Sequence, residues 1–182
     1  MNDESVEVRR LSGADLELAR DAFAMMSEVF GDEDATLSEE YLREILDRPD
    51  LWALAAVTGG RPVGALTAHR LPMTRAETAE LFIYDLAVRP DFQRRGVGRS
   101  LVDHLLTTAD PATVSSIFVP ADNEDTHALD FYRAVGGEAE AVTIFTFVPR
   151  PSMSPPDPMT SRDSRGLDPM TTTPRDDAGR QD

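Results

Sequence analysis

The sequence contains no cysteine and no lysine. Without cysteine the chain cannot form a disulfide, use a thiolate nucleophile or hold a cysteine-ligated zinc. All 18 basic residues are therefore arginines, which suggests a GC-rich bacterial genome because arginine codons are rich in G and C. The three histidines, His69, His104 and His127, are scattered and form no recognisable metal motif, so we expect no metal.

Positive charge is also scarce. The 18 arginines face 33 acidic residues, and the formal net charge is −15. Nucleic-acid binding requires a basic surface, so this composition argues against a nucleic-acid partner. It favours a cationic small molecule or a basic protein as the partner.

Long hydrophobic runs are absent as well. No apolar stretch approaches the roughly 20 residues that a membrane helix needs. The first ten residues, MNDESVEVRR, begin with acids and lack the apolar centre of a secretory signal. We therefore expect a soluble, cytoplasmic protein without a membrane partner.

Composition divides the 182 residues near Pro149. Residues 150–182 are rich in Pro, Ser, Thr, Asp and Arg and contain no aromatic residue, so we expect a disordered tail. Residues 1–149 carry 13 arginines and 27 acidic residues, so the acidity belongs to this single domain.

Within 1–149 the hydrophobic period alternates between that of strands and that of helices. We expect helices over 12–30, with Ser12 as the N-cap and Gly31 as the terminator, and over 38–47, 96–109 and 126–134. Strands are expected over 6–11, 51–57, 62–70, 80–88, 114–119 and 141–147. This order predicts an α/β domain with a mixed central sheet and helices on both faces.

The segment from Tyr84 to Arg99 carries the clearest chemistry. A strand is followed by a short loop, and Gly96 and Gly98 then open a helix that has no acidic first turn. Free backbone N–H groups at such a helix start, with the helix dipole, bind anions such as phosphate. Three arginines add local positive charge: Arg94, Arg95 and Arg99. The chain has no GxxxxGK[ST] loop, and Leu101 stands where a dinucleotide fingerprint needs its third glycine.

The run from Gln93 to Gly98 resembles the [Q/R]-x-x-G-x-[G/A] signature of the Gcn5-related N-acetyltransferases. The order of elements over about 5–148 is similar to that superfamily too. The resemblance implies acetyl-coenzyme A as co-substrate, with its pyrophosphate on the loop amides and its pantetheine along the strand 81–88. The implied cofactor residues are Leu86, Ala87, Val88, Arg94, Arg95, Gly96, Val97, Gly98 and Arg99.

Further features resemble one branch, the type I aminoglycoside 3-N-acetyltransferases. They are Phe30-Gly-Asp32, Ile83-Tyr-Asp-Leu-Ala-Val88, Ala121-Asp-Asn-Glu-Asp125, 128–132 and Gly136. Many superfamily members carry asparagine at the position of Asp125. That departure fits the branch but leaves open which group orients the pantetheine.

Asp85 lies inside an apolar strand, where an ionised carboxylate is costly unless it is paired or functional. One interpretation is a buried aspartate paired with an arginine. The functional interpretation places Asp85 in the substrate cleft, where it binds an ammonium and accepts the proton of the attacking amine. Its neighbour Tyr84 is a substrate-binding candidate, although strand alternation would allow it to pack in the core.

Tyr132 follows Ala128 by four residues on an expected helix, so the two share a face. Without the resemblance, Tyr132 is a core aromatic. With it, Tyr132 is implied as the acid that protonates the departing thiolate of coenzyme A, since a phenol stays protonated at neutral pH.

Two acidic stretches are candidates for the walls of the acceptor cleft. Alone, each is explained as a solvated loop with helix-capping acids; in an acetyltransferase both would border a polyammonium ligand. Their members are Asp32, Glu33 and Asp34, and Asp122, Glu124 and Asp125. His127, close to the second stretch, is a further ligand-contact candidate.

We therefore expect a cytoplasmic bacterial acetyltransferase of antibiotic resistance that acetylates the 3-amino group of aminoglycosides by direct amine attack. No GxSxG motif suggests an acyl-enzyme. The alternatives are another acceptor (a polyamine, an amino-sugar metabolite or a protein amine) or a non-catalytic acyl-coenzyme A sensor on the same fold. Family analogy allows a homodimer, which no residue pattern demonstrates.

Overall fold

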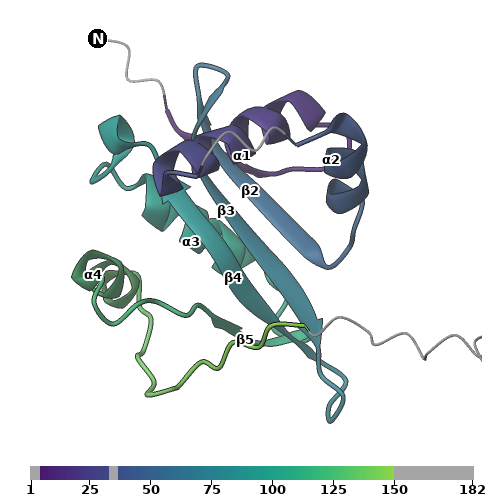
Figure 1. The fold of residues 1–182 in the computed structure, drawn as a ribbon, viewed down its shortest axis with the longest axis vertical. Coiled ribbons are helices and arrows are strands. Elements are labelled where there is room, and N and C mark those ends of the chain that lie inside the picture. The colour runs from purple at the N-terminus through teal and green to yellow at the C-terminus, as the bar shows by residue number, and fades with distance from the viewer. Residues whose placement is uncertain (1–4, 33–36, 150–182) are drawn as a thin grey trace, which may run out of the picture. The chain divides into compact units, whose positions relative to one another are not determined.

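The computed structural model of the chain describes residues 5–32 and 37–149 (Figure 1). Contacts divide it into a first unit that ends at Glu140 and a second that begins at Ala141. The elements of the first unit are β1 (Glu7–Arg10), α1 (Leu16–Phe30), α2 (Glu39–Leu46), β2 (Leu51–Thr58), β3 (Arg61–Pro72), β4 (Ala79–Val88), the 3₁₀ turn η1 (Pro90–Phe92), α3 (Val97–Thr108), β5 (Val114–Phe118) and α4 (Thr126–Ala134).

The described strands form one five-stranded sheet in the order β1-β2-β3-β4-β5. The first four strands pair antiparallel, and β5 joins β4 in parallel. A parallel pair needs a crossover, which α3 supplies between β4 and β5. Figure 1 shows α1 and α2 on one face of the sheet and α3 on the other. The predicted α/β domain with a mixed sheet is confirmed.

Each face of the sheet has its own hydrophobic core. On the α3 face, Leu66 and Leu81 of the sheet pack with Leu101 and Leu105 of the helix, and all four are fully buried. On the α1 face the contacts are made by small residues and two methionines, which let the helix approach the strands closely: Ala19, Ala22, Met25 and Met26 of α1, and Ala53, Ala55, Ala65 and Ala87 of the sheet.

A glycine sets the distance between α3 and β3. A Cβ atom on Gly64 would lie 2.8 Å from Cγ1 of Val97 and 3.3 Å from the carbonyl oxygen of Ala87. Only a residue without a side chain fits there. The close approach fixes where α3 begins relative to the end of β4.

A β-bulge interrupts β4 in the middle of the sheet. Thr67 pairs with Asp85, and the next residue of β3, Ala68, pairs with Ile83, so Tyr84 has no partner on β3. The extra residue shifts the alternation of side chains along β4. Tyr84 and Asp85 therefore both point to the α1 and α2 face, which strict alternation forbids.

The strands β4 and β5 part after a short pairing. Their register ends with Phe82 opposite Phe118, although β4 continues to Val88. From Ile83 onward, β4 has no β5 partner within the described residues. The backbone groups on that edge are free to bond to an extended ligand.

Two expectations about elements are corrected. The first helix begins at Leu16 rather than after Ser12, because the Asp15 carboxylate accepts hydrogen bonds from the Ser12 backbone N–H (3.0 Å) and hydroxyl (2.8 Å) and closes a turn there. The strand expected over 141–147 is wrong: residues 141–149 form no helix or strand, and Val142 and Phe147 are exposed. A β-branched, alternating sequence makes a strand only where another strand accepts its hydrogen bonds. The predicted tail, 150–182, lies outside the described residues.

Candidate active site

The loop between β4 and α3 has the backbone shape of an anion-binding site. Arg94 has φ of 61° and Gly96, the N-cap of α3, has φ of 86°. No side chain caps this helix, and its first turn contains no acidic residue. The unpaired N–H groups at the start of α3 remain available, as the glycine motif predicts.

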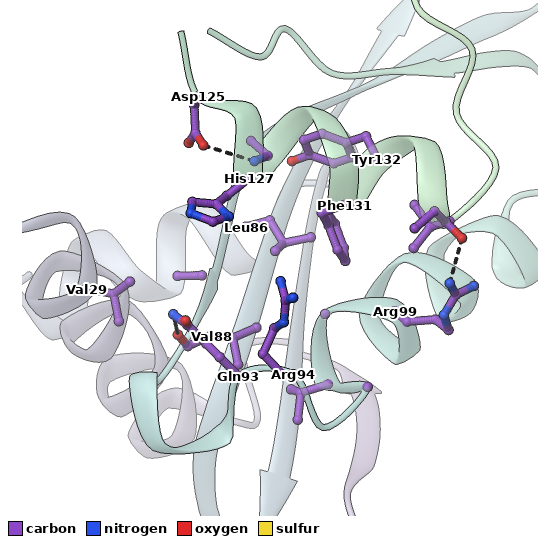
Figure 2. Close-up of a pocket in the computed structure, with 17 residues that line it drawn as sticks. Val29, Leu86, Val88, Gln93, Arg94, Arg99, Asp125, His127, Phe131 and Tyr132 are labelled. Carbon is purple, nitrogen blue, oxygen red and sulfur yellow. Dashed lines mark hydrogen bonds between the residues drawn. The ribbon is translucent and has the colours of Figure 1, made fainter. Parts of the chain in front are cut away.

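A cavity of about 410 Å³ opens above this loop. We call it the loop cavity; Figure 2 shows it between the end of β4, the start of α3 and the helix α4. Its lining residues from β4 and the loop are Leu86, Ala87, Val88, Gln93, Arg94, Gly96, Val97, Gly98 and Arg99. All the predicted cofactor residues except Arg95 therefore lie around one cavity.

Gln93 and Gly98 shape the floor of the loop cavity. The Gln93 side-chain amide donates a hydrogen bond of 3.1 Å to the Val88 carbonyl, which ties the loop back to the end of β4. A Cβ atom on Gly98 would lie 3.2 Å from the ring of Phe131, so this glycine lets α4 pack closely over α3. The Val88 carbonyl thus has a partner in the protein, and a ligand would meet the other free groups of this edge.

The three arginines of the motif have different surroundings. Arg94 projects from the loop toward α4, into the loop cavity (Figure 2). Arg99 donates a hydrogen bond of 2.6 Å to the Ala134 carbonyl and so holds the end of α4 on α3. The Arg95 guanidinium lies 5.4 Å from the centre of the Phe92 ring and is not part of the lining. The arginine that is free to meet an anion in the cavity is therefore Arg94.

Tyr132 lies on α4 and lines the loop cavity from the side opposite Arg94 (Figure 2). Burial raises the pKa of its phenol, and the nearby Asp125 carboxylate raises it further. A phenol with a raised pKa stays protonated at neutral pH and can donate a proton. Tyr132 also packs against Phe131 in a T-shaped contact with 5.1 Å between ring centres. The core interpretation is therefore partly right, because the side chain packs on a neighbour and lines the cavity at the same time.

A second cavity, of about 600 Å³, lies under α1 and α2. We call it the helix cavity. Asp85 and Tyr84 reach it from β4, and Thr67 and His69 from β3. Leu86 lines the loop cavity, and its neighbour Asp85 lines the helix cavity. Consecutive residues of β4 therefore contribute to the two cavities.

Asp85 is half-buried and accepts a hydrogen bond of 3.0 Å from the Thr67 hydroxyl on its Oδ2 atom. Burial raises the pKa of the carboxyl, the Thr67 hydrogen bond and the charge of His69 lower it, and the charge of Asp32 raises it. Within the described residues Asp85 forms no ion pair, so an arginine partner does not explain it. A raised pKa brings a carboxylate closer to what a base needs at neutral pH.

Tyr84 does not pack in the core: 63% of its surface is exposed, in the helix cavity beside Asp85. Sequence reasoning missed Thr67, which is the buried polar side chain of the described core. The signal was a lone hydroxyl in the apolar run from Val63 to Ala68, although the bulge that sets it opposite Asp85 has no sequence signature.

The acidic candidates separate. Asp32 lines the helix cavity with Asp85, while Glu33 and Asp34 lie outside the described residues. Asp122 accepts a hydrogen bond from the Glu124 backbone N–H (2.9 Å), and Asp125 caps α4 by accepting one from Ala128 (3.0 Å). Asp125 and His127 line the loop cavity rather than the helix cavity. A substrate contact by Asp122, Glu124 or Asp125 stays a prediction.

A family comparison agrees with this arrangement. The model of the acetyltransferase (GNAT) family matches residues 16–136, which include both cavities' strands, the loop and α4. The chain belongs to this family.

Solved structures with the same fold include aminoglycoside acetyltransferases. One from an uncultured soil metagenomic sample, in complex with sisomicin, is 27% identical with a TM-score of 0.75, covering 80% of this chain and 97% of that one. Another from such a sample is 31% identical with a TM-score of 0.72, covering 80% of this chain and 99% of that one.

Among curated proteins, the chain is similar to the ribosomal protein bS18-alanine N-acetyltransferase of Salmonella typhimurium. The two are 31% identical over 64 residues, which is 35% of this chain and 43% of that protein. The Escherichia coli K12 counterpart is 28% identical over the same length. The chain thus matches less than half of the length of these relatives.

Within 5–32 and 37–149 no helix is both long and apolar enough to cross a membrane. The same residues contain no group of three or more histidine, aspartate or glutamate side chains placed to hold a metal ion.

Proposed function

We propose that the protein transfers the acetyl group of acetyl-coenzyme A to the 3-amino group of an aminoglycoside antibiotic. The observation that carries this proposal is Asp85: a half-buried carboxylate that forms no ion pair within the described residues and that Thr67 holds at the wall of a 600 Å³ cavity. A cationic acceptor supplies the missing counter-charge. The likeness to solved aminoglycoside acetyltransferases over 80% of the chain supports the same acceptor class.

The residues of the loop cavity fit acetyl-coenzyme A. The free N–H groups at the start of α3 and the Arg94 side chain suit its phosphates, which carry the opposite charge. The edge of β4 from Ile83 to Ala87, which has no β5 partner within the described residues, suits the amides of an extended pantetheine, which add to it as a strand does. The cavity thus offers an anion-binding end beside an edge that suits an extended chain, in the order that the cofactor needs.

The chemistry requires that an amine held at Asp85 reaches a thioester at the free edge of β4. A protonated amine binds at Asp85, which takes its proton, and the neutral nitrogen then attacks the thioester carbonyl. The C–N bond forms, the tetrahedral intermediate collapses, and the C–S bond breaks. Tyr132 gives its proton to the departing thiolate. The nitrogen of the product loses its second proton, which returns to Tyr132, and Asp85 releases the first proton to solvent. The amide and free coenzyme A then leave.

A second acceptor class has its own support. The curated relatives act on the alanine of ribosomal protein bS18, so an α-amino group of a protein is the alternative acceptor. Both acceptors are cationic amines, and Asp85 serves either. The part of the acceptor beyond its amine, which the helix cavity must accommodate, therefore determines which of the two classes is the substrate.

The test is the release of coenzyme A thiol in the steady state with a panel of acceptors: gentamicin, kanamycin, spermidine and a peptide that begins with alanine. We expect kcat/KM above about 10⁴ M⁻¹s⁻¹ with an aminoglycoside, the low end for ordinary enzymes. NMR of the product is expected to place the acetyl group on the 3-amino nitrogen. Turnover confined to the peptide or to spermidine would overturn the aminoglycoside assignment, and acetylation at another nitrogen would overturn the regiochemistry.

A further inference from the structure

Four rings form a continuous row on the α1 and α2 face of the sheet. His69 contacts Tyr84 edge to face with 5.7 Å between ring centres, Tyr84 contacts Phe82 in the same way at 5.7 Å, and Phe82 stacks on Phe118 at 5.4 Å. We call these four residues the aromatic row. They come from three neighbouring strands, β3, β4 and β5.

The aromatic row lies largely outside the cores. Tyr84 is 63% exposed and Phe118 is 43% exposed, and neither packs in the two core clusters. Its position follows from the register: His69 pairs with Phe82 across β3 and β4, and Phe82 pairs with Phe118 across β4 and β5. Solvent-exposed aromatic rings that contact one another are typical of a surface that binds a ligand or a partner.

One end of the aromatic row opens into the helix cavity, because His69 and Tyr84 line it together with Asp85. Glu80 lies two residues before Phe82 on β4, and so on the same face, on the side of Phe82 away from Asp85. Glu80 accepts a hydrogen bond of 2.9 Å from the Ser116 hydroxyl and has no ion-pair partner within the described residues.

Asp85 and Glu80 are five residues apart, which corresponds to roughly 15 Å along a strand. The face between them therefore carries a carboxylate, a row of rings and a second carboxylate. Flat rings stack on the apolar faces of sugar and cyclitol rings, and they attract ammonium groups through their π-electrons. The two carboxylates suit two ammonium groups of the same molecule, one on the reacting ring and one on an outer ring.

We infer that the aromatic row is a subsite for the outer rings of a multi-ring, polycationic acceptor whose reacting amine lies at Asp85 and whose distal ammonium lies at Glu80. This inference rests on the proposed function and adds the direction in which the acceptor lies. Contacts remote from the reacting amine raise kcat/KM for the whole acceptor but give nothing to a fragment that cannot reach them.

The test compares a three-ring aminoglycoside, gentamicin, with its single central ring, 2-deoxystreptamine. We expect Phe118→Ala to lower kcat/KM for gentamicin about tenfold, as loss of a ring contact of ~1.4 kcal/mol would. Its kcat/KM for 2-deoxystreptamine and its KM for acetyl-coenzyme A stay at the wild-type values. Phe118→Tyr, which keeps the ring, restores gentamicin turnover, and Glu80→Gln lowers gentamicin turnover selectively.

A matched control is Leu106→Ala, which removes an exposed apolar side chain from α3, on the other face of the sheet. We expect this variant to leave kcat/KM unchanged for both gentamicin and 2-deoxystreptamine. Equal losses for both acceptors with Phe118→Ala, or no loss for either, would overturn the subsite. So would a change from dimer to monomer by sedimentation with gentamicin kinetics unchanged, because the aromatic row would then contact a second copy. Failure of the wild-type protein to acetylate either aminoglycoside acceptor would instead overturn the proposed function, and the subsite with it.

Discussion

The Thr67 hydroxyl donates a hydrogen bond of 3.0 Å to Oδ2 of Asp85 across the bulge between β3 and β4. The bond fixes one carboxylate oxygen and leaves Oδ1 for a ligand. It also stabilises the ionised form against the burial that raises the pKa of Asp85. Thr67 is thus a positioning residue, and its effect can be separated from that of the carboxylate it holds.

Thr67→Val removes the hydroxyl but keeps the shape of the side chain. Because the lost bond favoured the carboxylate, the pKa of Asp85 rises and the acid limb of kcat/KM moves to higher pH. We expect kcat to fall three- to tenfold, in line with one hydrogen bond of ~1 kcal/mol. The measurement is a pH–rate profile.

Two controls bracket this result. Thr67→Ser keeps the donor and is expected to restore the acid limb to its wild-type position. Asp32→Asn removes a negative charge that raises the pKa of Asp85, so the limb moves to lower pH. Thr67→Val and Asp32→Asn shifts of the same sign would contradict this account of Asp85.

The charge on Asp85 costs folding free energy at neutral pH. Burial raises its pKa above the unfolded value of about 3.9, so the folded state holds the proton more tightly. The protonated carboxyl therefore stabilises the fold relative to the ionised one, and this contribution is complete below the unfolded pKa and is lost as the pH rises through the folded pKa. Asp85→Asn is therefore expected to raise the melting temperature at pH 8, with a difference that vanishes in acid. A melting temperature lowered at pH 8 would mean that the ionised carboxylate stabilises the fold.

Arg94 and Arg95 are adjacent, yet only Arg94 lines the loop cavity. Arg94→Gln removes a charge that faces the cofactor site, and we expect KM for acetyl-coenzyme A to rise about tenfold, since charge-assisted hydrogen bonds are worth ~1.5–3 kcal/mol. Arg95→Gln, the matched control, is expected to change that KM less than about twofold. Equal effects would show that the cavity does not distinguish the two side chains.

Tyr132→Phe removes the phenolic hydroxyl from the loop cavity and keeps the ring that packs on Phe131. We expect kcat to fall roughly 100-fold, a size typical of general-acid catalysis, while KM for the acceptor stays unchanged. Equilibrium dialysis of acetyl-coenzyme A provides the control, because binding should persist. An unchanged kcat would remove Tyr132 from the proton path.

The sequence was a good guide where local chemistry decides the structure. The glycine loop, the helix that follows it and the alternating strands could be predicted, because turn geometry and hydrophobic period depend on neighbouring residues. One motif predicted the cluster of cofactor residues. It did not predict that the Arg95 side chain would lie by the Phe92 ring and not line the loop cavity.

The rest depended on pairing between distant residues. Strand alternation placed Tyr84 and Asp85 on opposite faces, and a bulge set by β3 brings them to the same one. The run 141–147 has the pattern of a strand but forms none, since a strand needs a partner that the pattern does not supply.

The central claim is that Asp85 accepts the proton of a cationic amine that attacks acetyl-coenzyme A bound along the free edge of β4. The most direct test measures thiol release from acetyl-coenzyme A with gentamicin by wild-type protein and by Asp85→Asn, with acetyl-coenzyme A affinity determined for both. We expect turnover by the wild type, a loss of 100-fold or more in kcat for Asp85→Asn, and equal affinities for acetyl-coenzyme A. Undiminished turnover by Asp85→Asn, or none by the wild type while acetyl-coenzyme A binds, would contradict it.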